Sequence, residues 1–169
     1  RYFKMATLTL PPTIDIAATY NTASIQGVKF WAAEDNDGAP TGVTGGQAEE
    51  QSVTWTNINI SGKTGLSFSG LFATGPTAGW DHGTATINAD YMVVESNIDN
   101  TGWVNVLDFR PNSLNMTNGS LSIDANHDGL GEGTVLNTTF TEFTANIAGT
   151  GTTMQLRVTV RSNTLAEEV

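Results

Sequence analysis

The stretch from Asp90 to Phe109, DYMVVESNIDNTGWVNVLDF, contains two apolar runs around the polar tetrad Asp99 to Gly102. Each run alternates between two faces and is rich in β-branched and aromatic residues, which predicts two β-strands. The tetrad is predicted to be a turn, because Asp and Asn tolerate a left-handed backbone and Gly adopts a positive φ without steric cost. The stretch therefore predicts a β-hairpin.

Both faces of this hairpin carry apolar residues, so we expect it to lie in the middle of a sheet with a second layer packed on it. Strict alternation in the second run predicts that four residues share one face: Trp103, Asn105, Leu107 and Phe109.

The rest of the chain carries short alternating segments separated by Gly, Pro, Asn and Asp. No extended window keeps a helical period, so the segments predict an all-β fold, an antiparallel two-sheet β-sandwich. We expect residues 13–169 to form this sandwich and residues 1–12 to form an N-terminal strand and connector that ends at Pro11 and Pro12. The expected strands are Lys4 to Leu10, Val28 to Ala33, Ser52 to Ile60, Leu66 to Ala73, Leu121 to Ile123, Thr139 to Ile147 and Met154 to Val160.

The amino-acid composition limits the kinds of molecule that the chain is expected to bind. The formal net charge of -10 disfavours nucleic acid and anionic membranes and suits bound cations. Charged residues are 14% of the chain, against roughly 25% in ordinary domains, and a Thr/Asn/Ser/Gly surface of this kind suits a secreted or cell-surface protein. The chain has no cysteine, no apolar run near the roughly 18 residues of a membrane span, and no signal-like segment after Arg1, so we expect a processed chain or an excised piece.

One acidic loop has the spacing of a calcium-binding loop. Asp124, Asn126 and Asp128, followed by a glycine, match D-x-N-x-D-G, in which alternate oxygens surround one hard cation. Leu130 would add its carbonyl oxygen and Glu132 would occupy the ninth position. The alternative is a turn that the Asp and Asn side chains cap.

The loop departs from an EF-hand at its twelfth position, which is Val135 in place of a bidentate glutamate, and no helices flank it. A second acidic cluster, Glu34, Asp35 and Asp37, follows an expected strand. We expect this cluster either to bind calcium, on its own or by converging with the first loop, or to be a solvated turn.

A Gly/Pro-rich loop carries Trp80, Asp81 and His82, which are candidates for a ligand-binding pocket. An exposed tryptophan stacks on sugar rings, so Trp80 suggests glycan binding. The alternatives are core packing for Trp80 and a loop anchor for its neighbours. The other three tryptophans are expected in core or half-core positions: Trp31, Trp55 and Trp103.

No catalytic motif is present. His82 and His127 are the only histidines, there is no cysteine, and no G-x-S-x-G motif occurs. Two isolated histidines do not make a zinc site. We therefore predict that the chain is not an enzyme.

Four segments resemble a jelly-roll-like β-sandwich module of secreted bacterial multidomain proteins, some of which carry extracellular nuclease domains. The segments are TWTNINISGKTGLSFSGLFA, DYMVVESNIDNTGWVNVLDFR, SIDANHDGLGEG and TFTEFTANIAGTGTTMQLRVTVRSNTLAEEV, and the resemblance covers Phe30 to Val169. It implies a jelly-roll-like sandwich with an accessory, binding or structural role and, often, bound calcium.

Members of that family usually continue beyond the position of Val169 into one more strand. The resemblance thus implies an unpaired sheet edge and an open apolar groove, and a bare edge pairs readily with another strand. The N-terminal strand, Met5 to Leu10, is the expected occupant. It would pair within its own chain or in a neighbouring copy, and exchange between copies would give a homo-oligomer or filament. The remaining alternative is that the chain is simply truncated before the last strand.

Two functions follow. The first is a non-catalytic extracellular structural or adhesive subunit, stabilised by calcium and polymerising by strand exchange. The alternative is a glycan-binding accessory domain of a secreted hydrolase or nuclease.

Overall fold

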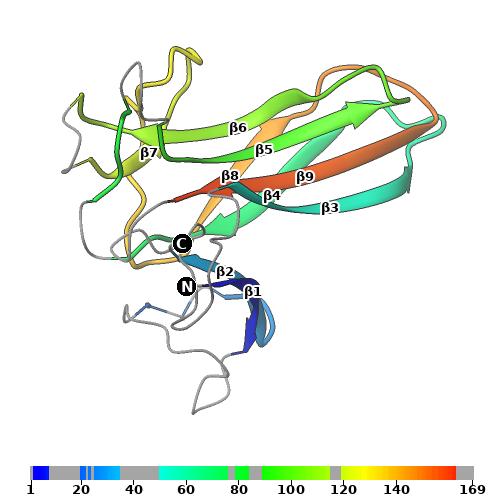
Figure 1. Ribbon diagram of the computed structural model, residues 1–169. Helices are drawn as coiled ribbons and strands as arrows, with labels where there is room; N and C mark the ends of the chain where they lie inside the picture. Colours follow the sequence, from blue (N-terminus) through cyan, green and yellow to red (C-terminus); the bar gives the residue numbers. More distant parts are fainter. Residues whose placement is uncertain are drawn as a thin grey trace, which may run out of the picture.

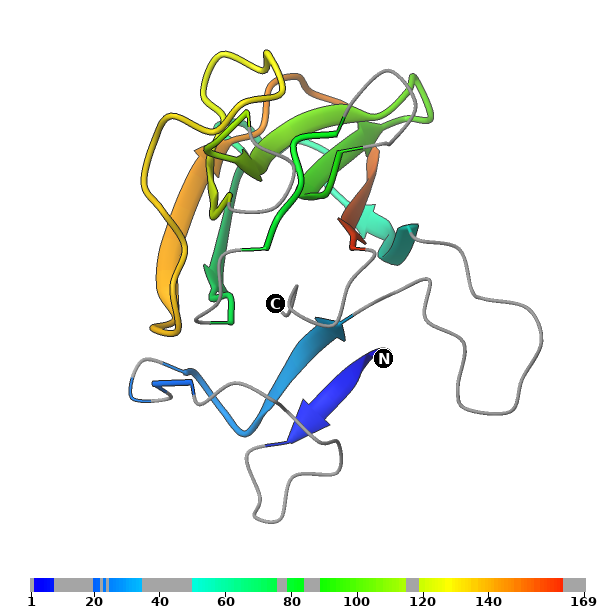
Figure 2. The same cartoon turned by 60° about the vertical axis from the view of Figure 1, so that its left-hand side comes forward.

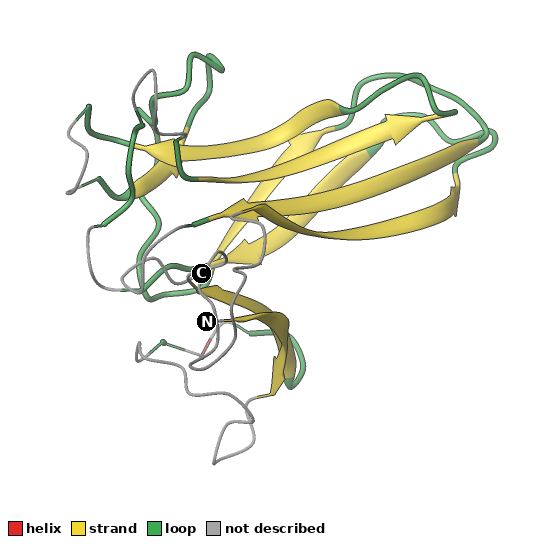
Figure 3. Ribbon diagram, viewed as in Figure 1, coloured by secondary structure: helices red, strands yellow, loops and turns green. Residues whose placement is uncertain are grey.

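The computed structural model describes residues 2–7, 20–21, 23, 25–34, 50–75, 79–83, 89–114 and 119–162. Within these ranges it contains strands and no α-helix (Figure 3). None of the described residues belongs to a helix that is long and apolar enough to cross a membrane. The strands are β1 (Tyr2–Thr7), β2 (Lys29–Glu34), β3 (Glu50–Asn59), β4 (Ser67–Phe72), β5 (Tyr91–Ile98), β6 (Val104–Pro111), β7 (Leu121–Ile123), β8 (Thr141–Asn146) and β9 (Thr153–Arg161).

Two antiparallel sheets form the body of the molecule (Figure 1). One has five strands in the order β3-β9-β5-β6-β7, and the other pairs β4 with β8. Apolar residues of both sheets pack against each other, so the predicted all-β antiparallel sandwich is confirmed. Its jelly-roll connectivity stays a prediction. A third sheet, β1 with β2, lies below the other two sheets in the views of Figures 1 and 2.

The predicted hairpin is β5–β6, and β5 is the central strand of the five-stranded sheet. Asp99 and Asn100 have φ angles of 48° and 59°, and the Thr101 amide donates to the Ile98 carbonyl oxygen at 3.0 Å. This is a tight two-residue turn with a left-handed backbone, whose twist matches that of the flanking strands. The turn chemistry of the tetrad was therefore sufficient to place the hairpin.

The strict alternation expected for the second strand is wrong, because a β-bulge interrupts it. Val94 pairs with Leu107, whereas Glu95 pairs with Asn105, so Val106 is the extra residue on β6. An extra residue reverses the direction of the side chains that precede it. Asn105 therefore lies on the face of Glu95, opposite to the face that carries Leu107.

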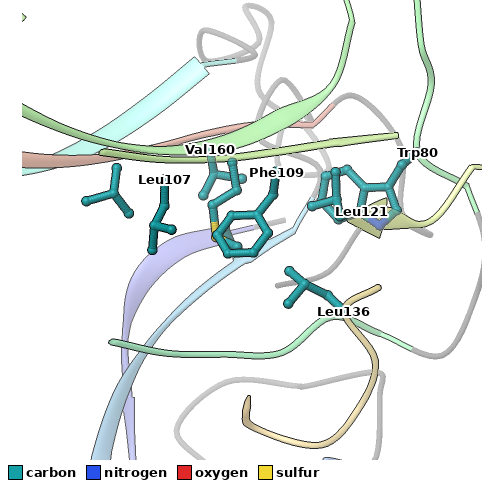
Figure 4. Close-up of a cluster of buried hydrophobic side chains, with 9 residues drawn as sticks. Trp80, Leu107, Phe109, Leu121, Leu136 and Val160 are labelled. Atoms are coloured by element: carbon teal, nitrogen blue, oxygen red, sulfur yellow. The ribbon is translucent and has the colours of Figure 1, made fainter. Parts of the chain in front are cut away.

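The hydrophobic core lies between the sheets and is rich in aromatic rings. Phe109 on β6 is fully buried, and its ring lies 5.1 Å from that of Phe72 on β4 and 5.0 Å from that of Phe143 on β8. Such ring pairs each contribute about 0.5–1.5 kcal/mol beyond the buried area. Figure 4 shows residues of one contiguous buried cluster, among them Trp80, Leu107, Phe109, Leu121, Leu136 and Val160.

The N-terminal strand was predicted from Lys4 to Leu10 and is observed as β1, Tyr2–Thr7. It pairs antiparallel with β2, with Met5 opposite Trp31, and joins neither sheet of the sandwich. The expectation that it fills an open edge of the sandwich within its own chain is therefore wrong for the described part of the strand. Residues 8–19, with Pro11 and Pro12 and the expected boundary after residue 12, lie outside the described residues.

Candidate metal centre and the Trp80 loop

The acidic loop begins where β7 ends and is fastened to the five-stranded sheet at both of its ends. The Asp124 amide donates to the Asp108 carbonyl oxygen on β6 at 2.9 Å. At the other end, the Glu132 amide donates to the Ile123 carbonyl oxygen at 3.0 Å. The Leu136 amide then donates to the Leu121 carbonyl oxygen. The loop is thus part of the sheet edge, with its ends fixed by strand-like hydrogen bonds.

Asp124 organises the interior of the loop. It is only 1% exposed, and its two carboxylate oxygens accept the amides of Asp128 at 3.2 Å and Gly129 at 2.8 Å. His127 and Gly129 have φ angles of 59° and 93°, which fold the chain back over the Asp124 carboxylate. Because glycine adopts such angles without strain, the D-x-N-x-D-G spacing has a direct conformational reason here.

Three carboxylates converge in this loop. Ligand oxygens of Asp124, Asp128 and Glu132 all lie within 4.8 Å of one another. Asn126 belongs to the same group, because its Nδ2 donates to an Asp128 oxygen at 3.1 Å and its Oδ1 accepts the Asp128 amide at 3.0 Å. Like charges at this separation repel, so the arrangement favours a bound cation.

The donor set fits a hard cation such as calcium, which prefers carboxylate and amide oxygens over nitrogen or sulfur. Four of the five predicted ligands, Asp124, Asn126, Asp128 and Glu132, are brought together by hydrogen bonds or by short distances between their oxygens. The fifth, Leu130, donates its amide to the Asp128 carboxylate at 3.0 Å, which places it at the loop. The remaining positions of a six- to eight-fold shell would fall to backbone carbonyls or water.

The second predicted cluster is only partly described. Glu34 is the last residue of β2, where it lies opposite Tyr2. Asp35 and Asp37 lie outside the described residues. Calcium binding by this cluster, and its convergence with the loop around Asp124, stay predictions.

One buried carboxylate beside the loop was not singled out from the sequence. The Asp108 side chain is 2% exposed and accepts two hydrogen bonds from Arg110, at 2.7 Å and 3.1 Å, and one from Asn105 at 3.1 Å. His127 Nδ1 lies 3.7 Å from the same carboxylate. Period-two spacing puts Asp108 and Arg110 on one face of β6, so their ion pair could have been predicted from the sequence. The approach of His127 could not, because it depends on tertiary structure. Since Arg110 neutralises Asp108, this carboxylate is already engaged.

Trp80 does not meet the requirement for glycan stacking. It is 1% exposed and belongs to the main core cluster, where it lies close to Leu121 (Figure 4). Its backbone forms a bridge to Gly119, and a Cβ on Gly119 would lie 2.5 Å from the Trp80 carbonyl oxygen. The backbone of Trp80 therefore packs closely against Gly119, shortly before β7. The prediction that the Trp80 ring packs in the core is confirmed.

Asp81 and His82 are half-buried in the loop that follows Trp80. The Asp81 amide donates to the Asp90 carboxylate at 2.7 Å, and the Asp90 amide donates to the Asp81 carbonyl oxygen at 2.9 Å. Burial raises the pKa of Asp81 above its ordinary value. These contacts fit the loop-anchor alternative, and ligand binding by Asp81 and His82 stays a prediction.

The exposed indoles belong to other tryptophans. Trp31 is 43% exposed and Trp55 is 42% exposed, although both were expected in core or half-core positions. Both line one groove at the side of the sandwich. Trp103 is half-buried, as predicted, and the guanidinium carbon of Arg157 lies 4.1 Å from its ring centroid.

No protein-family model matches the chain, and no curated protein or solved structure is significantly similar to it.

Proposed function

We propose that this chain is a non-catalytic, extracellular structural or adhesive subunit. Calcium stabilises its β-sandwich, and copies assemble into a filament by exchanging the N-terminal strand. The convergence of Asp124, Asp128 and Glu132 within 4.8 Å carries the proposal, because three oxygen donors at this separation suit a hard cation in a chain with a net charge of -10.

Calcium in this loop would act on the stability of the core. The loop leads directly to Leu136, which is 3% exposed and packs in the main cluster. A divalent cation offsets two of the three negative charges, so it reduces the repulsion between the carboxylates and holds Leu136 in place against Leu121. Ligand at about 100 times its dissociation constant adds about 2.7 kcal/mol to the free energy of unfolding.

Strand exchange is supported by the isolation of β1. It pairs with β2 over Tyr2–Thr7 and joins neither sheet of the sandwich, so another copy can supply the same strand without disturbing the core. Exchange of identical elements preserves every native contact and costs little free energy. When each copy donates to the next and the rotation does not close a ring, the product is an open filament.

An extracellular location is supported by composition. The chain combines 14% charged residues with a complete absence of cysteine, so no thiol is exposed to oxidation outside the cell. Calcium at extracellular concentrations is sufficient for the weak sites that such modules use, with dissociation constants on the order of 10⁻⁴–10⁻³ M.

A glycan-binding accessory domain of a secreted hydrolase or nuclease is the second candidate. The exposed indoles of Trp31 and Trp55 favour it, in place of Trp80. A glycan array probed with the purified chain tests it, with Trp31→Ala and Trp55→Ala expected to abolish any binding. Binding that both substitutions leave intact would contradict this assignment.

The main proposal is tested by calcium titration of the purified chain. Isothermal calorimetry should detect one binding event per chain, and the melting temperature should rise with calcium and return when a chelator is added. A melting temperature that is the same in calcium and in chelator would reject the cation site. Assembly is tested separately by electron microscopy and light scattering, where monomers that persist at high concentration would reject strand exchange.

A further inference from the structure

One side of the sandwich is incomplete within the described residues. A sheet of five strands faces a sheet of only two, so the inner face of β3 extends beyond the cover that β4 and β8 provide. Val53 and Trp55 on β3 lie opposite Val158 and Leu156 on β9, and they face the same side as the core. Trp55 nonetheless remains 42% exposed. The apolar face is therefore wider than the layer that covers it.

A groove of about 280 Å³ follows this uncovered side. Its lining comes from β2, β3, β4, β5 and β9, and it includes Val53, Trp55, Phe68, Phe72, Phe30 and Trp31. Figure 2 shows β4 and β8 on one side, β3 and β9 on the other, and β2 crossing below them. Within the part of the chain that the structure describes, β3 and β4 each pair on one edge only, so two sheet edges flank the groove.

Gly70 lies in the middle of β4 and contributes to the groove. A Cβ at this position would lie 2.7 Å from the ring of Phe68 and 3.0 Å from that of Phe72. The two rings therefore close over Gly70, and a side chain at this position would have to displace them. Glycine in the interior of a strand weakens the strand, and here it allows the rings of Phe68 and Phe72 to form one continuous apolar wall.

The chemistry of the groove restricts its occupant. Of the described residues that line it, only Gln26 and Lys29 have polar side chains, and Lys29 is the only charged one. A glycan would stack on the indoles of Trp31 and Trp55 but would find few partners for its hydroxyl groups, and such unpaired groups are costly when desolvated. Apolar side chains fit the walls, and a carboxylate complements Lys29. The free sheet edges offer amide and carbonyl groups that only another polypeptide backbone matches.

The strand β1 of a second copy is a poorer match for this groove. It carries Lys4, which would bring a second positive charge to the side where Lys29 lies. A carboxylate in the bound segment would pair with Lys29 instead, and this short-range attraction has to outweigh the long-range repulsion from the net charge of -10. Charge complementarity therefore favours a partner other than β1.

We propose that the groove between β3 and β4 binds an extended, acidic peptide segment of a partner protein. The segment adds as a strand to the free edge of β4, covers Trp31 and Trp55, and places a carboxylate beside Lys29. This inference does not rest on the calcium site or on exchange of β1.

Selection from a phage-displayed library of random nonapeptides on the purified chain tests the proposal. We expect enriched sequences that alternate apolar and polar residues and contain Asp or Glu. A synthetic copy of an enriched peptide should change the fluorescence of the groove tryptophans. It should also slow hydrogen exchange of the amides in Ser67–Phe72, because a bound strand makes hydrogen bonds to β4.

Two variants test whether the selected peptides bind in this groove. Trp55→Ala should weaken binding by about tenfold or more. Lys29→Glu should shift the selection from acidic to basic peptides. Lys63→Glu is the matched control, because Lys63 is exposed in the turn after β3 and does not line the groove, and it should leave the selection unchanged. Since Lys29 is also exposed, its variant keeps the test valid even if Trp55→Ala fails to fold.

Three results would overturn the proposal. The first is a selection that enriches no sequence. The second is an enriched peptide that binds the Lys29→Glu chain as tightly as the natural one. The third is binding of dodecanoate or of a glycan in the groove without protection of the β4 amides, which would assign the groove to a ligand that is not a strand.

Discussion

The Asp99 carboxylate, at the tip of the β5–β6 hairpin, accepts both the amide and the hydroxyl group of Thr153, at 2.8 Å and 3.2 Å. The Asp99 amide in turn donates to the Thr153 carbonyl oxygen at 3.0 Å. Thr152 adds its own amide and hydroxyl to the same carboxylate. The turn of the central hairpin is thereby bound to the start of β9, the strand that pairs with β5 along its whole length.

These contacts predict a specific dependence of stability on pH. The hydrogen bonds from the Thr153 and Thr152 amides lower the pKa of Asp99 below its ordinary value of 3.8. A carboxyl group with a lowered pKa in the folded state stabilises the fold above its unfolded pKa, and this contribution is lost as the pH falls through the folded value. Asp99→Asn should therefore lose less stability than the natural chain between about pH 5 and pH 2.

Urea unfolding at a series of pH values measures this difference. Glu142→Gln is a suitable control, because Glu142 lies on β8, away from the hairpin tip, and its side chain pairs with Ser69. If Asp99→Asn and the natural chain lose stability in parallel as the solution is acidified, the role assigned to Asp99 is wrong.

Substitution of Trp80 should lower the free energy of unfolding much more than substitution of Trp31. Trp80→Ala removes a ring that is 1% exposed and should cost about 3–5 kcal/mol of the free energy of unfolding. Trp31→Ala removes a ring that is 43% exposed and should cost much less. Denaturant unfolding at neutral pH compares the two, and equal losses would contradict the burial of Trp80.

The sequence predicted those features that depend on neighbouring residues. The Asp99–Asn100 turn follows from local backbone preferences of Asp, Asn and Gly and was predicted correctly. The same preferences account for the capped turn around Asp124, one of the two predicted alternatives, whereas calcium binding by this loop stays a prediction. The strand segments followed from period-two patterning. In each case the physical cause lies within a few residues along the chain.

Features that depend on distant contacts were missed. The bulge at Val106 arises from pairing with β5, and no glycine or proline marks it. Trp55 lies in a strand but is left exposed because β4 and β8 do not cover it, which the sequence did not indicate. Trp80 is different, because core packing was one of its two predicted roles, although its burial depends on the distant chain near Gly119. The alternation of polar and apolar residues along a strand shows which residues share a face of the sheet. It does not show whether a second layer covers that face.

Asp124 and Asp128 should have separable roles in the acidic loop. Asp124 is buried and accepts two backbone amides, so Asp124→Ala should lower stability by about 2 kcal/mol or more even without calcium. Asp128 is exposed, so Asp128→Asn should keep the calcium-free stability and weaken calcium binding by at least about tenfold.

Melting curves with calcium and with chelator, for both variants and for Glu142→Gln, separate the two effects. The control should keep the full calcium-dependent rise in melting temperature. A calcium response that survives unchanged in Asp128→Asn would show that the ion binds elsewhere.

Strand exchange can be detected covalently, because the chain has no cysteine of its own. Met5 and Trp31 lie directly opposite each other in the β1–β2 ladder and are exposed by 50% and 43%, so cysteines at both positions are placed for a disulfide. If β1 is exchanged, oxidation of the Met5→Cys, Trp31→Cys chain should give a ladder of covalent multimers on a non-reducing gel, with the ladder vanishing after reduction. Each single variant controls for random pairing and should give no more than dimers. A double variant that oxidises completely while remaining a covalent monomer at all concentrations would show that β1 pairs within its own chain, and filament assembly through this strand would then be excluded.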